Sequence, residues 1–182
     1  GYARAVAAGL TTDGVIGDFD SMPRAVVGDC PVIALPTHKD DTDTEHCMAV
    51  GRERGYHSFL LAGGIGGRLD HTMTNIQLLY DAALRGEEAV LLGGLNEARI
   101  LMPGCHRLPR RAGYHLSLLA YTPEVTGLTL RGVEYQLTDY TLVNHTSLGV
   151  SNEWTAKEAV ISFTGGALLT IYAKDASLQQ KP

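Results

Sequence analysis

Residues 59–71 read Phe-Leu-Leu-Ala-Gly-Gly-Ile-Gly-Gly-Arg-Leu-Asp-His. The apolar residues at the start predict a short buried strand, and the glycines after them predict tight turns or a close approach of the backbone to a ligand. From about Asp70, apolar side chains recur at helical spacing until Gly86, at Met73, Ile76, Leu79 and Ala83. This stretch therefore predicts a strand, a glycine loop and a helix in direct succession.

The same alternation of apolar runs and helical patterns extends over the first half of the chain. Further strands are predicted at the apolar runs of residues 15–16, 32–35 and 89–92. Thr42 and Glu45 have the spacing of a capping box, which predicts a helix that begins there and ends near Gly55. Because the apolar runs do not alternate with polar residues, they favour a parallel sheet covered on both faces. Residues 1–94 are therefore predicted to form an α/β domain with a mainly parallel sheet (α/β/α).

The pattern changes after about Gly94, where no long helical period is found. Short segments rich in Val, Leu, Thr and Tyr are separated there by proline or glycine, at residues 100–101, 116–121, 128–130, 159–163 and 168–172. Many short strands with regular turn signals are typical of an antiparallel sandwich or barrel. Residues 95–182 are therefore predicted to form an all-β, sandwich-like C-terminal domain, with the boundary near residues 93–98.

The composition is typical of a globular protein that forms a core and has no nucleic-acid partner. Of the 182 residues 45% are hydrophobic, and 15 Lys and Arg against 20 Asp and Glu give a net charge of −5. A duplex-binding protein usually carries a basic face, which this acidic chain does not show. No apolar run approaches the ~20 residues that cross a bilayer, so no membrane partner is expected. The three scattered cysteines, without a Cys-x-x-Cys pair, predict a reduced, cytoplasmic protein.

Acidic residues follow the predicted strands at the points where ligands bind to an open parallel sheet. Asp18 and Asp20 come directly after the first strand, and Asp43 opens the helix after the second. Because the carboxyl ends of parallel strands meet at one edge, these carboxylates are expected to converge. Crowded carboxylates repel one another unless a cation lies between them. Since Mg²⁺ takes one or two carboxylates and leaves positions for phosphate oxygens, the sequence predicts a magnesium site.

Each of these features also has a purely structural explanation. An Asx turn accounts for the loop after the first strand, and the helix dipole accounts for Asp43. The glycine loop lacks a following Gly-Lys-Ser/Thr, so it is not a Walker P-loop, and it fits a simple strand-to-helix turn. Arg68 and Asp70 fit a surface ion pair with a helix cap. The joint placement of the acidic residues, the glycine loop and His71 at successive strand ends nevertheless favours a ligand site.

Four stretches of the sequence, taken together, resemble the thiamin pyrophosphokinase family. They occur in the family's order, at residues 15–21, 39–45, 63–75 and 148–153. The combination of Gly-Asp-x-Asp-Ser with Gly-Gly-Arg-x-Asp-His is the specific part of the resemblance. The resemblance implies an α/β catalytic domain, a β-rich domain that binds thiamin, and a homodimer. It also implies transfer of a pyrophosphoryl group from ATP to the hydroxyethyl group of thiamin, with release of AMP.

The resemblance also implies roles for individual residues by their positions in the motifs. Four residues are implied to be catalytic, the first three of them as magnesium ligands: Asp18, Asp20, Asp43 and Arg68. The nucleotide side is implied to consist of Thr42, Arg68, Asp70 and His71.

On the thiamin side, the resemblance implies Ser151 and Asn152, with Tyr135 as an aromatic ring that stacks on the thiamin pyrimidine. A hydroxyl and an amide suit the hydrogen-bonding edge of an aminopyrimidine and offer no positive charge to a triphosphate. Two simpler roles stay open, in which Asn152 caps a turn and Tyr135 packs inside the sandwich.

The chain departs from the family pattern in two places. The family has a strand and an Ala-Asp-Gly-Gly segment before its first helix, and only Gly1 of these is present. The resemblance therefore implies that the N-terminal strand is missing and that the sequence is incomplete. Asp41 stands where many relatives have an uncharged residue, and it adds a negative charge beside the predicted magnesium site.

Two other functions remain open from the sequence. A magnesium-dependent phosphohydrolase would use Asp18 as its nucleophile, but it leaves the glycine loop and the β-rich half without a role. A non-catalytic regulatory module that binds a nucleotide or thiamin would suit the truncated start. Thiamin-dependent formation of AMP distinguishes the three, because a hydrolase gives phosphate without thiamin and a binding module gives neither product.

Overall fold

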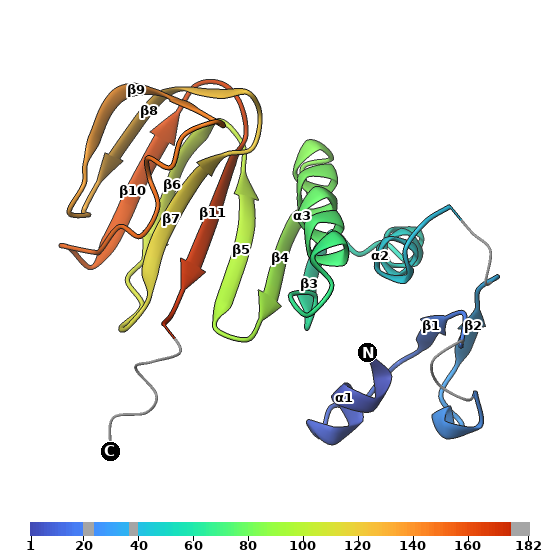
Figure 1. Cartoon of the computed structure of the whole chain (residues 1–182). Coiled ribbons are helices and arrows are strands. Elements are labelled where there is room, and N and C mark those ends of the chain that lie inside the picture. Colours follow the sequence, from blue (N-terminus) through green and yellow to red (C-terminus); the bar gives the residue numbers. More distant parts are fainter. Residues whose placement is uncertain (20–23, 37–39, 176–182) are drawn as a thin grey trace, which may run out of the picture. The chain divides into compact units, whose positions relative to one another are not determined.

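The computed structural model describes residues 1–19, 24–36 and 40–175 and divides the chain into two compact units (Figure 1). Unit 1 is Gly1–His57 and unit 2 is Ser58–Pro182. The sequence instead predicts a boundary near residues 93–98. The compact units divide earlier because the strands on either side of that boundary hydrogen-bond to each other within one sheet.

Unit 1 contains a short parallel pair of strands and the helix with the predicted cap. Its elements are α1 (Tyr2–Ala7), β1 (Val15–Gly17), the 3-10 helix η1 (Arg24–Val27), β2 (Val32–Ala34) and α2 (Asp43–Glu53). β1 and β2 pair in parallel, with Val15 opposite Val32. The hydroxyl of Thr42 accepts a hydrogen bond from the Glu45 amide at 3.2 Å, which confirms the predicted start of α2.

Unit 2 is β-rich, with two sheets in the orders β3-β4-β5-β11-β7 and β6-β10-β8-β9. Its elements are β3 (Ser58–Ala62), α3 (Leu69–Leu84), β4 (Glu88–Gly93), β5 (Asn96–Leu101), β6 (Gly104–Pro109), β7 (His115–Ala120), β8 (Glu124–Arg131), β9 (Leu137–Val143), β10 (Glu158–Phe163) and β11 (Leu168–Ala173). β3 and β4 are parallel, whereas β4 and β5 are antiparallel. The strand–loop–helix unit and the β-rich second half are confirmed, but the five-stranded sheet is mixed.

The two sheets of unit 2 face each other across a shared core (Figure 1). Buried side chains of both sheets form it, among them Leu116, Leu118, Leu168, Val125, Leu130 and Ile161. On the opposite face of the five-stranded sheet, α3 packs on β4 and β5 through Leu79, Leu91 and Ala98. The sequence predicts cover on both faces here, but α3 is the only helix within the described part of unit 2. Leu60 of the edge strand β3 is accordingly 64% exposed.

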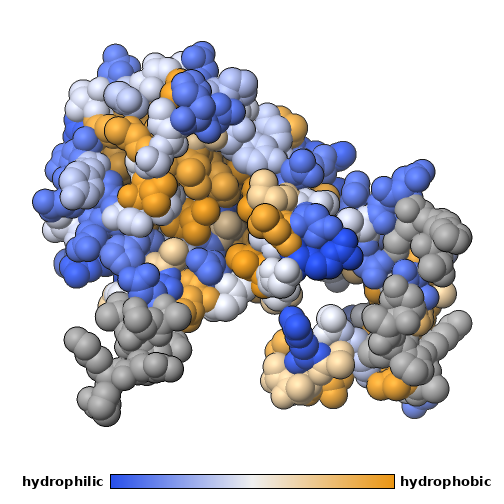
Figure 2. Space-filling model, viewed as in Figure 1, coloured by the Kyte–Doolittle hydropathy of each residue, from blue (hydrophilic) through white to orange (hydrophobic). Residues whose placement is uncertain are grey.

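Beyond α3, the same face of the sheet carries partly buried apolar side chains that we call the apolar strip. It consists of Ile100 on β5, Leu119 on β7 and Ile171 on β11. Figure 2 shows apolar side chains gathered over these strands on the visible face of unit 2. Such a strip is a candidate surface for association with another protein chain.

Two further observations bear on the environment of the protein. Across the described ranges, no helix is both long enough and apolar enough to cross a membrane. Cys30, Cys47 and Cys105 all carry free thiols.

Candidate functional site

The glycine loop at residues 63–67 is tightly packed at one end and open at the other. Asn75, buried on α3, donates a hydrogen bond from Nδ2 to the Gly64 carbonyl at 2.8 Å. A Cβ on Gly64 would lie 2.6 Å from Leu91 Cδ1 and 2.8 Å from Asn75 Nδ2, so only glycine fits there. A Cβ on Gly66, by contrast, would meet nothing within 4 Å among the described residues. The second half of the loop therefore leaves room for a ligand to approach the backbone.

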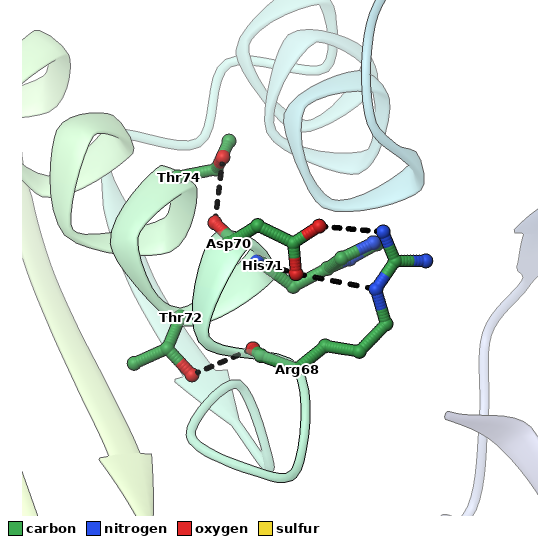
Figure 3. Close-up of polar contacts among 5 residues, drawn as sticks. All are labelled: Arg68, Asp70, His71, Thr72 and Thr74. Atoms are coloured by element: carbon green, nitrogen blue, oxygen red, sulfur yellow. Dashed lines mark hydrogen bonds and ion pairs between the residues drawn. The ribbon is translucent and has the colours of Figure 1, made fainter.

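Arg68 and Asp70 form a two-pronged ion pair where the loop enters α3 (Figure 3). Arg68 donates from Nε to Asp70 Oδ1 at 3.2 Å and from Nη2 to Oδ2 at 2.5 Å. The backbone amide of His71 donates to the same Oδ1 at 2.9 Å. The ion pair lies in solvent, with 72% of the Arg68 side chain and 62% of the Asp70 side chain exposed.

Two threonines in the first turns of α3 fix the backbone beneath this ion pair. The Thr72 hydroxyl donates to the Arg68 carbonyl at 3.3 Å, and the Thr74 hydroxyl donates to the Asp70 carbonyl at 3.0 Å (Figure 3). Arg68 occupies the N-cap position without a side-chain capping bond. The surface ion pair that the sequence allowed is thus present, and it places a cationic fork at the N-terminus of a 16-residue helix.

The titration of the Asp70 carboxyl group in this ion pair can be measured directly. Hydrogen bonds from the Arg68 side chain, and then from the His71 amide, lower the pKa of Asp70 from 3.8 to about 2. Because this pKa is lowered, the ion pair persists at neutral pH and is lost as the pH falls through about 2. In Arg68→Ala, we expect NMR of the Asp70 carboxyl carbon to show the pKa rising toward 3.8. An unchanged pKa in this variant would contradict the ion pair.

Asp43 places its carboxylate over the end of β1, where Asp18 follows. A Cβ on Gly17, the last residue of β1, would lie 3.5 Å from Asp43 Oδ2. Asp18 is half-buried and Asp43 is exposed in the first turn of α2. Phe19, which follows Asp18, has a left-handed φ of 59°. This backbone conformation is strained for a bulky residue, and such strained residues cluster at functional sites.

This pair of acidic residues fits part of the predicted magnesium site. The Asp43 carboxylate lies near Gly17 at the end of β1, which Asp18 follows, whereas Asp20 lies outside the described residues. Within residues 1–19, 24–36 and 40–175, no three His, Cys, Asp or Glu side chains are grouped to hold a metal ion. Two carboxylates suffice for Mg²⁺, which keeps most of its water ligands, so the chemistry of the donor set fits.

The neighbours of Asp43 have defined contacts of their own. Asp41 Oδ2 lies 3.0 Å from His46 Nδ1, so the extra negative charge noted in the sequence has a histidine beside it. Thr42 caps α2 through its hydroxyl oxygen and stays partly exposed. The cap and the first turn together hold Asp43 at the start of α2.

In unit 2 the structure links the predicted residues Asn152 and Tyr135, which are 17 positions apart. Asn152 Oδ1 accepts a hydrogen bond from the Tyr135 amide at 3.0 Å, and Nδ2 donates to the Tyr135 carbonyl at 2.8 Å. Asn152 is 2% exposed, whereas Tyr135 is 71% exposed. Tyr135 therefore does not pack inside the sandwich, which was one of its two possible roles.

Ser151 lies at the surface beside this link and has a left-handed φ of 59°. Its amide donates to Ser117 Oγ on β7 at 3.0 Å. In the described part of the chain only Phe19, Asp139 and Ser151 are non-glycine residues with positive φ. Two of these three lie in motifs predicted to be functional.

A buried ion-pair network was missed by the sequence reasoning. Glu97 on β5 has an 8% exposed side chain and contacts Arg99 and, at 2.5 Å, Arg111 Nη1. Burial alone would raise the pKa of Glu97, but the hydrogen bonds from Arg111 and Arg99 outweigh it and the pKa is lowered. Glu97 and Arg111 line a cavity of about 300 Å³ that reaches Gly63. The sequence carried no signal for it, because a charged pair 14 positions apart matches no motif.

Comparisons with known proteins agree over most of the chain. The family described as "Thiamin pyrophosphokinase, catalytic domain" matches residues 1–91, and "Thiamin pyrophosphokinase, vitamin B1 binding domain" matches residues 105–168. The thiamine pyrophosphokinase of Bacillus subtilis (strain 168) is 27% identical over 174 residues, which cover 92% of this chain and 81% of that protein.

Solved structures show the same relationship. The crystal structure of Bacillus subtilis thiamine pyrophosphokinase matches with a TM-score of 0.87 at 26% identity, covering 94% of this chain and 83% of the other. That of Geobacillus thermodenitrificans thiamin pyrophosphokinase matches with a TM-score of 0.84 at 30% identity, covering 96% and 83%. This chain belongs to the thiamin pyrophosphokinase family.

Proposed function

We propose that Asp18, Asp20 and Asp43 hold Mg²⁺ and that Arg68 binds the phosphates of ATP in the reaction of this family. The reaction is ATP-dependent transfer of a pyrophosphoryl group to thiamin, with AMP as the second product. The observation that carries the assignment is the Asp43 carboxylate over the end of β1, beside Asp18. When bound, magnesium neutralises charge on the phosphate oxygens.

The residues of the site otherwise act by positioning the two substrates. The thiamin hydroxyl attacks the β-phosphorus in line and AMP leaves, so the protein needs no covalent nucleophile. The Arg68 guanidinium faces a carboxylate, and a phosphate likewise offers two oxygens that can accept its paired hydrogen bonds. Because the ion pair is exposed, it exchanges partners readily. Asp70 keeps the fork oriented, while Thr42 and His71 complete the nucleotide side.

On the thiamin side, we assign Tyr135 as the ring that stacks on the pyrimidine, with Ser151 and Asn152 beside it. The exposed Tyr135 ring and the left-handed, surface-exposed Ser151 support this assignment. The assignment divides the chain by function into residues 1–94, an α/β/α catalytic domain, and residues 95–182, a thiamin-binding domain. The parallel pairs β1–β2 and β3–β4 support a mainly parallel sheet in the first domain.

Thiamin-dependent release of AMP tests the function. The full chain, mixed with ATP, Mg²⁺ and thiamin, should form AMP and thiamin diphosphate in equal amounts, and removal of Mg²⁺ by EDTA should stop the reaction. Phosphate release without thiamin would support the magnesium-dependent phosphohydrolase instead. Binding of ATP or thiamin without either product would support a regulatory module.

The glycine loop gives a matched pair of variants. Gly64→Ala forces a methyl group against Leu91 and Asn75, so we expect a stability loss of about 1–3 kcal/mol. Gly66→Ala puts the methyl group into open space, so we expect an unchanged melting temperature but a several-fold higher KM for ATP, because the phosphates approach that backbone. Thermal melts and steady-state kinetics on both variants test this. Equal melting temperatures for the two variants would contradict the packing described for Gly64.

We also propose a homodimer that is joined through the β-rich half, in the cytoplasm. The apolar strip of Ile100, Leu119 and Ile171 supports a partner surface on unit 2, and the free thiols suit a reducing compartment. Sedimentation velocity at micromolar concentration should give a dimer, and Leu119→Asp should shift it toward monomer. A fully active wild-type monomer under these conditions would refute the dimer.

A further inference from the structure

The side-chain oxygen of Asn152 accepts hydrogen bonds from two backbone amides. Oδ1 accepts hydrogen bonds from the amides of Tyr135 and Glu153, both at 3.0 Å. Nδ2 donates to the Tyr135 carbonyl at 2.8 Å. A carboxamide oxygen has two lone pairs, so this one has no acceptor capacity left for a ligand. With 2% of the residue exposed, Asn152 is also shielded from any molecule at the surface.

The backbone of Asn152 is held equally firmly on β7. Its amide donates to the Leu116 carbonyl at 2.8 Å, and its carbonyl accepts from the Leu116 amide at 2.9 Å. On the other side, the Glu134 amide donates to the Glu153 carbonyl at 2.9 Å. Asn152 therefore connects β7, a strand of the five-stranded sheet, to the segment that carries Tyr135.

This connection holds the main chain of Tyr135 in place although its large aromatic side chain is exposed. Both of its backbone polar groups are satisfied by one side chain, so its main chain is fixed, yet 71% of the residue is exposed. Val133, two residues earlier, is completely buried and anchors the same segment, where it bridges to Trp154. A fixed backbone with an exposed ring is a preformed stacking surface, which lowers the entropic cost of binding a flat ligand.

We propose that Asn152 is a positioning residue that acts on thiamin only through Tyr135, whose backbone it holds so that the ring meets the pyrimidine. The proposal rests on the assignment of Tyr135 to thiamin stacking. It replaces a direct hydrogen bond between Asn152 and thiamin with an indirect effect. Loss of the Asn152 amide then loosens Tyr135 and removes the same binding contribution as loss of the ring.

A double-mutant cycle on the full chain tests this, with Asn152→Ala, Tyr135→Ala and the double variant. Each single change should raise the KM for thiamin about tenfold, equivalent to ~1.4 kcal/mol, and leave the KM for ATP within about twofold. The double variant should be no worse than either single variant, because both remove the same contribution. If Asn152 contacted thiamin directly, the two effects would multiply.

Hydrogen exchange tests directly whether the Asn152 hydrogen bonds hold the Tyr135 segment in place. Amides of residues 133–136 should exchange faster in Asn152→Ala but stay protected in Tyr135→Ala, which keeps the Asn152 bonds. Thr122→Val is the matched control, since it removes two comparable side-chain bonds, to the Glu124 carbonyl and the Ala167 amide, elsewhere in the same unit. This control should lower the melting temperature without changing the KM for thiamin.

Asn152→Ser is uncharged and keeps a hydroxyl that can accept a hydrogen bond, so it serves if Asn152→Ala does not fold, and a smaller rise in the KM for thiamin is expected. A rise in the KM for thiamin that persists in the Tyr135→Ala background would overturn the positioning role. So would unchanged exchange of residues 133–136 in Asn152→Ala. Failure of the wild-type chain to form AMP with thiamin would overturn the proposed function itself, which separates the two failures.

Discussion

Replacing Asp43 by Asn should lower turnover at least about 100-fold while the fold is retained, because the change removes a charge that stabilises the reacting phosphates. Asp43 is exposed in the first turn of α2, where its charge interacts favourably with the helix dipole by about 0.3–1 kcal/mol, so we expect its replacement to leave the helix folded. The half-saturating Mg²⁺ concentration should rise in the same variant. Rates measured across a Mg²⁺ titration, together with a thermal melt, test both effects.

Asp40→Asn is the matched control for this variant. It removes one exposed carboxylate from the same loop and is expected to leave turnover within about twofold. A loss as large as that of Asp43→Asn would mean that the general charge of the loop, and not a ligand position, controls the rate. Wild-type turnover in Asp43→Asn would refute the magnesium assignment at the end of β1.

Arg68→Ala should lower kcat/KM for ATP at least about 100-fold. The variant loses the positive charge at the start of α3, which is the one assigned to binding the phosphate oxygens of ATP. Arg68→Lys should lose about tenfold, since an ammonium keeps the charge but not the planar fork. The exposed ion pair with Asp70 contributes little stability, so melting temperatures should stay close to wild type. Steady-state kinetics with ATP varied at saturating thiamin measure the effect.

The same helix offers a control at its other end. At the C-terminus of α3, Arg85 donates from Nε to both carboxylate oxygens of Asp81, each at 3.1 Å. Arg85→Ala removes an equivalent surface ion pair and should leave ATP kinetics unchanged. Comparable losses in the Arg68 and Arg85 variants would place the effect in helix stability and refute phosphate binding by Arg68.

Much of the catalytic half could be predicted because its signals are local. The strand–loop–helix unit from β3 to α3 and the Thr42 cap depend on residues within a few positions of one another. The strands that were not predicted are β6 and β9, which form the two edges of the four-stranded sheet. Edge strands need fewer buried side chains, and in β9 four successive residues, 138–141, are exposed. Their polar sequences therefore lack the apolar pattern by which a strand is recognised.

The site was less predictable than the fold, because its decisive contacts join distant positions. Motif spacing indicated Arg68 and Asp70, which are two residues apart, and the structure pairs them. No local pattern could show that the Asn152 amide binds the Tyr135 backbone 17 residues away. The hydrogen-bonding groups of a side chain can bind either a ligand or the protein's own backbone. Which of the two they bind depends on whether the side chain is buried. The 2% exposure of Asn152 is visible only once the fold is known.

Trp154 is the single tryptophan of the chain, 7% exposed and stacked on Tyr172 with ring centroids 5.3 Å apart in the core of unit 2. Tryptophan fluorescence therefore reports the melting of unit 2 alone, whereas far-ultraviolet circular dichroism also records α1 and α2 of unit 1. Comparing the two signals during heating shows whether the units unfold together or in sequence. Because residues of both units are assigned to ATP and its magnesium, added ATP should delay both transitions, whereas thiamin should delay mainly the tryptophan transition of unit 2.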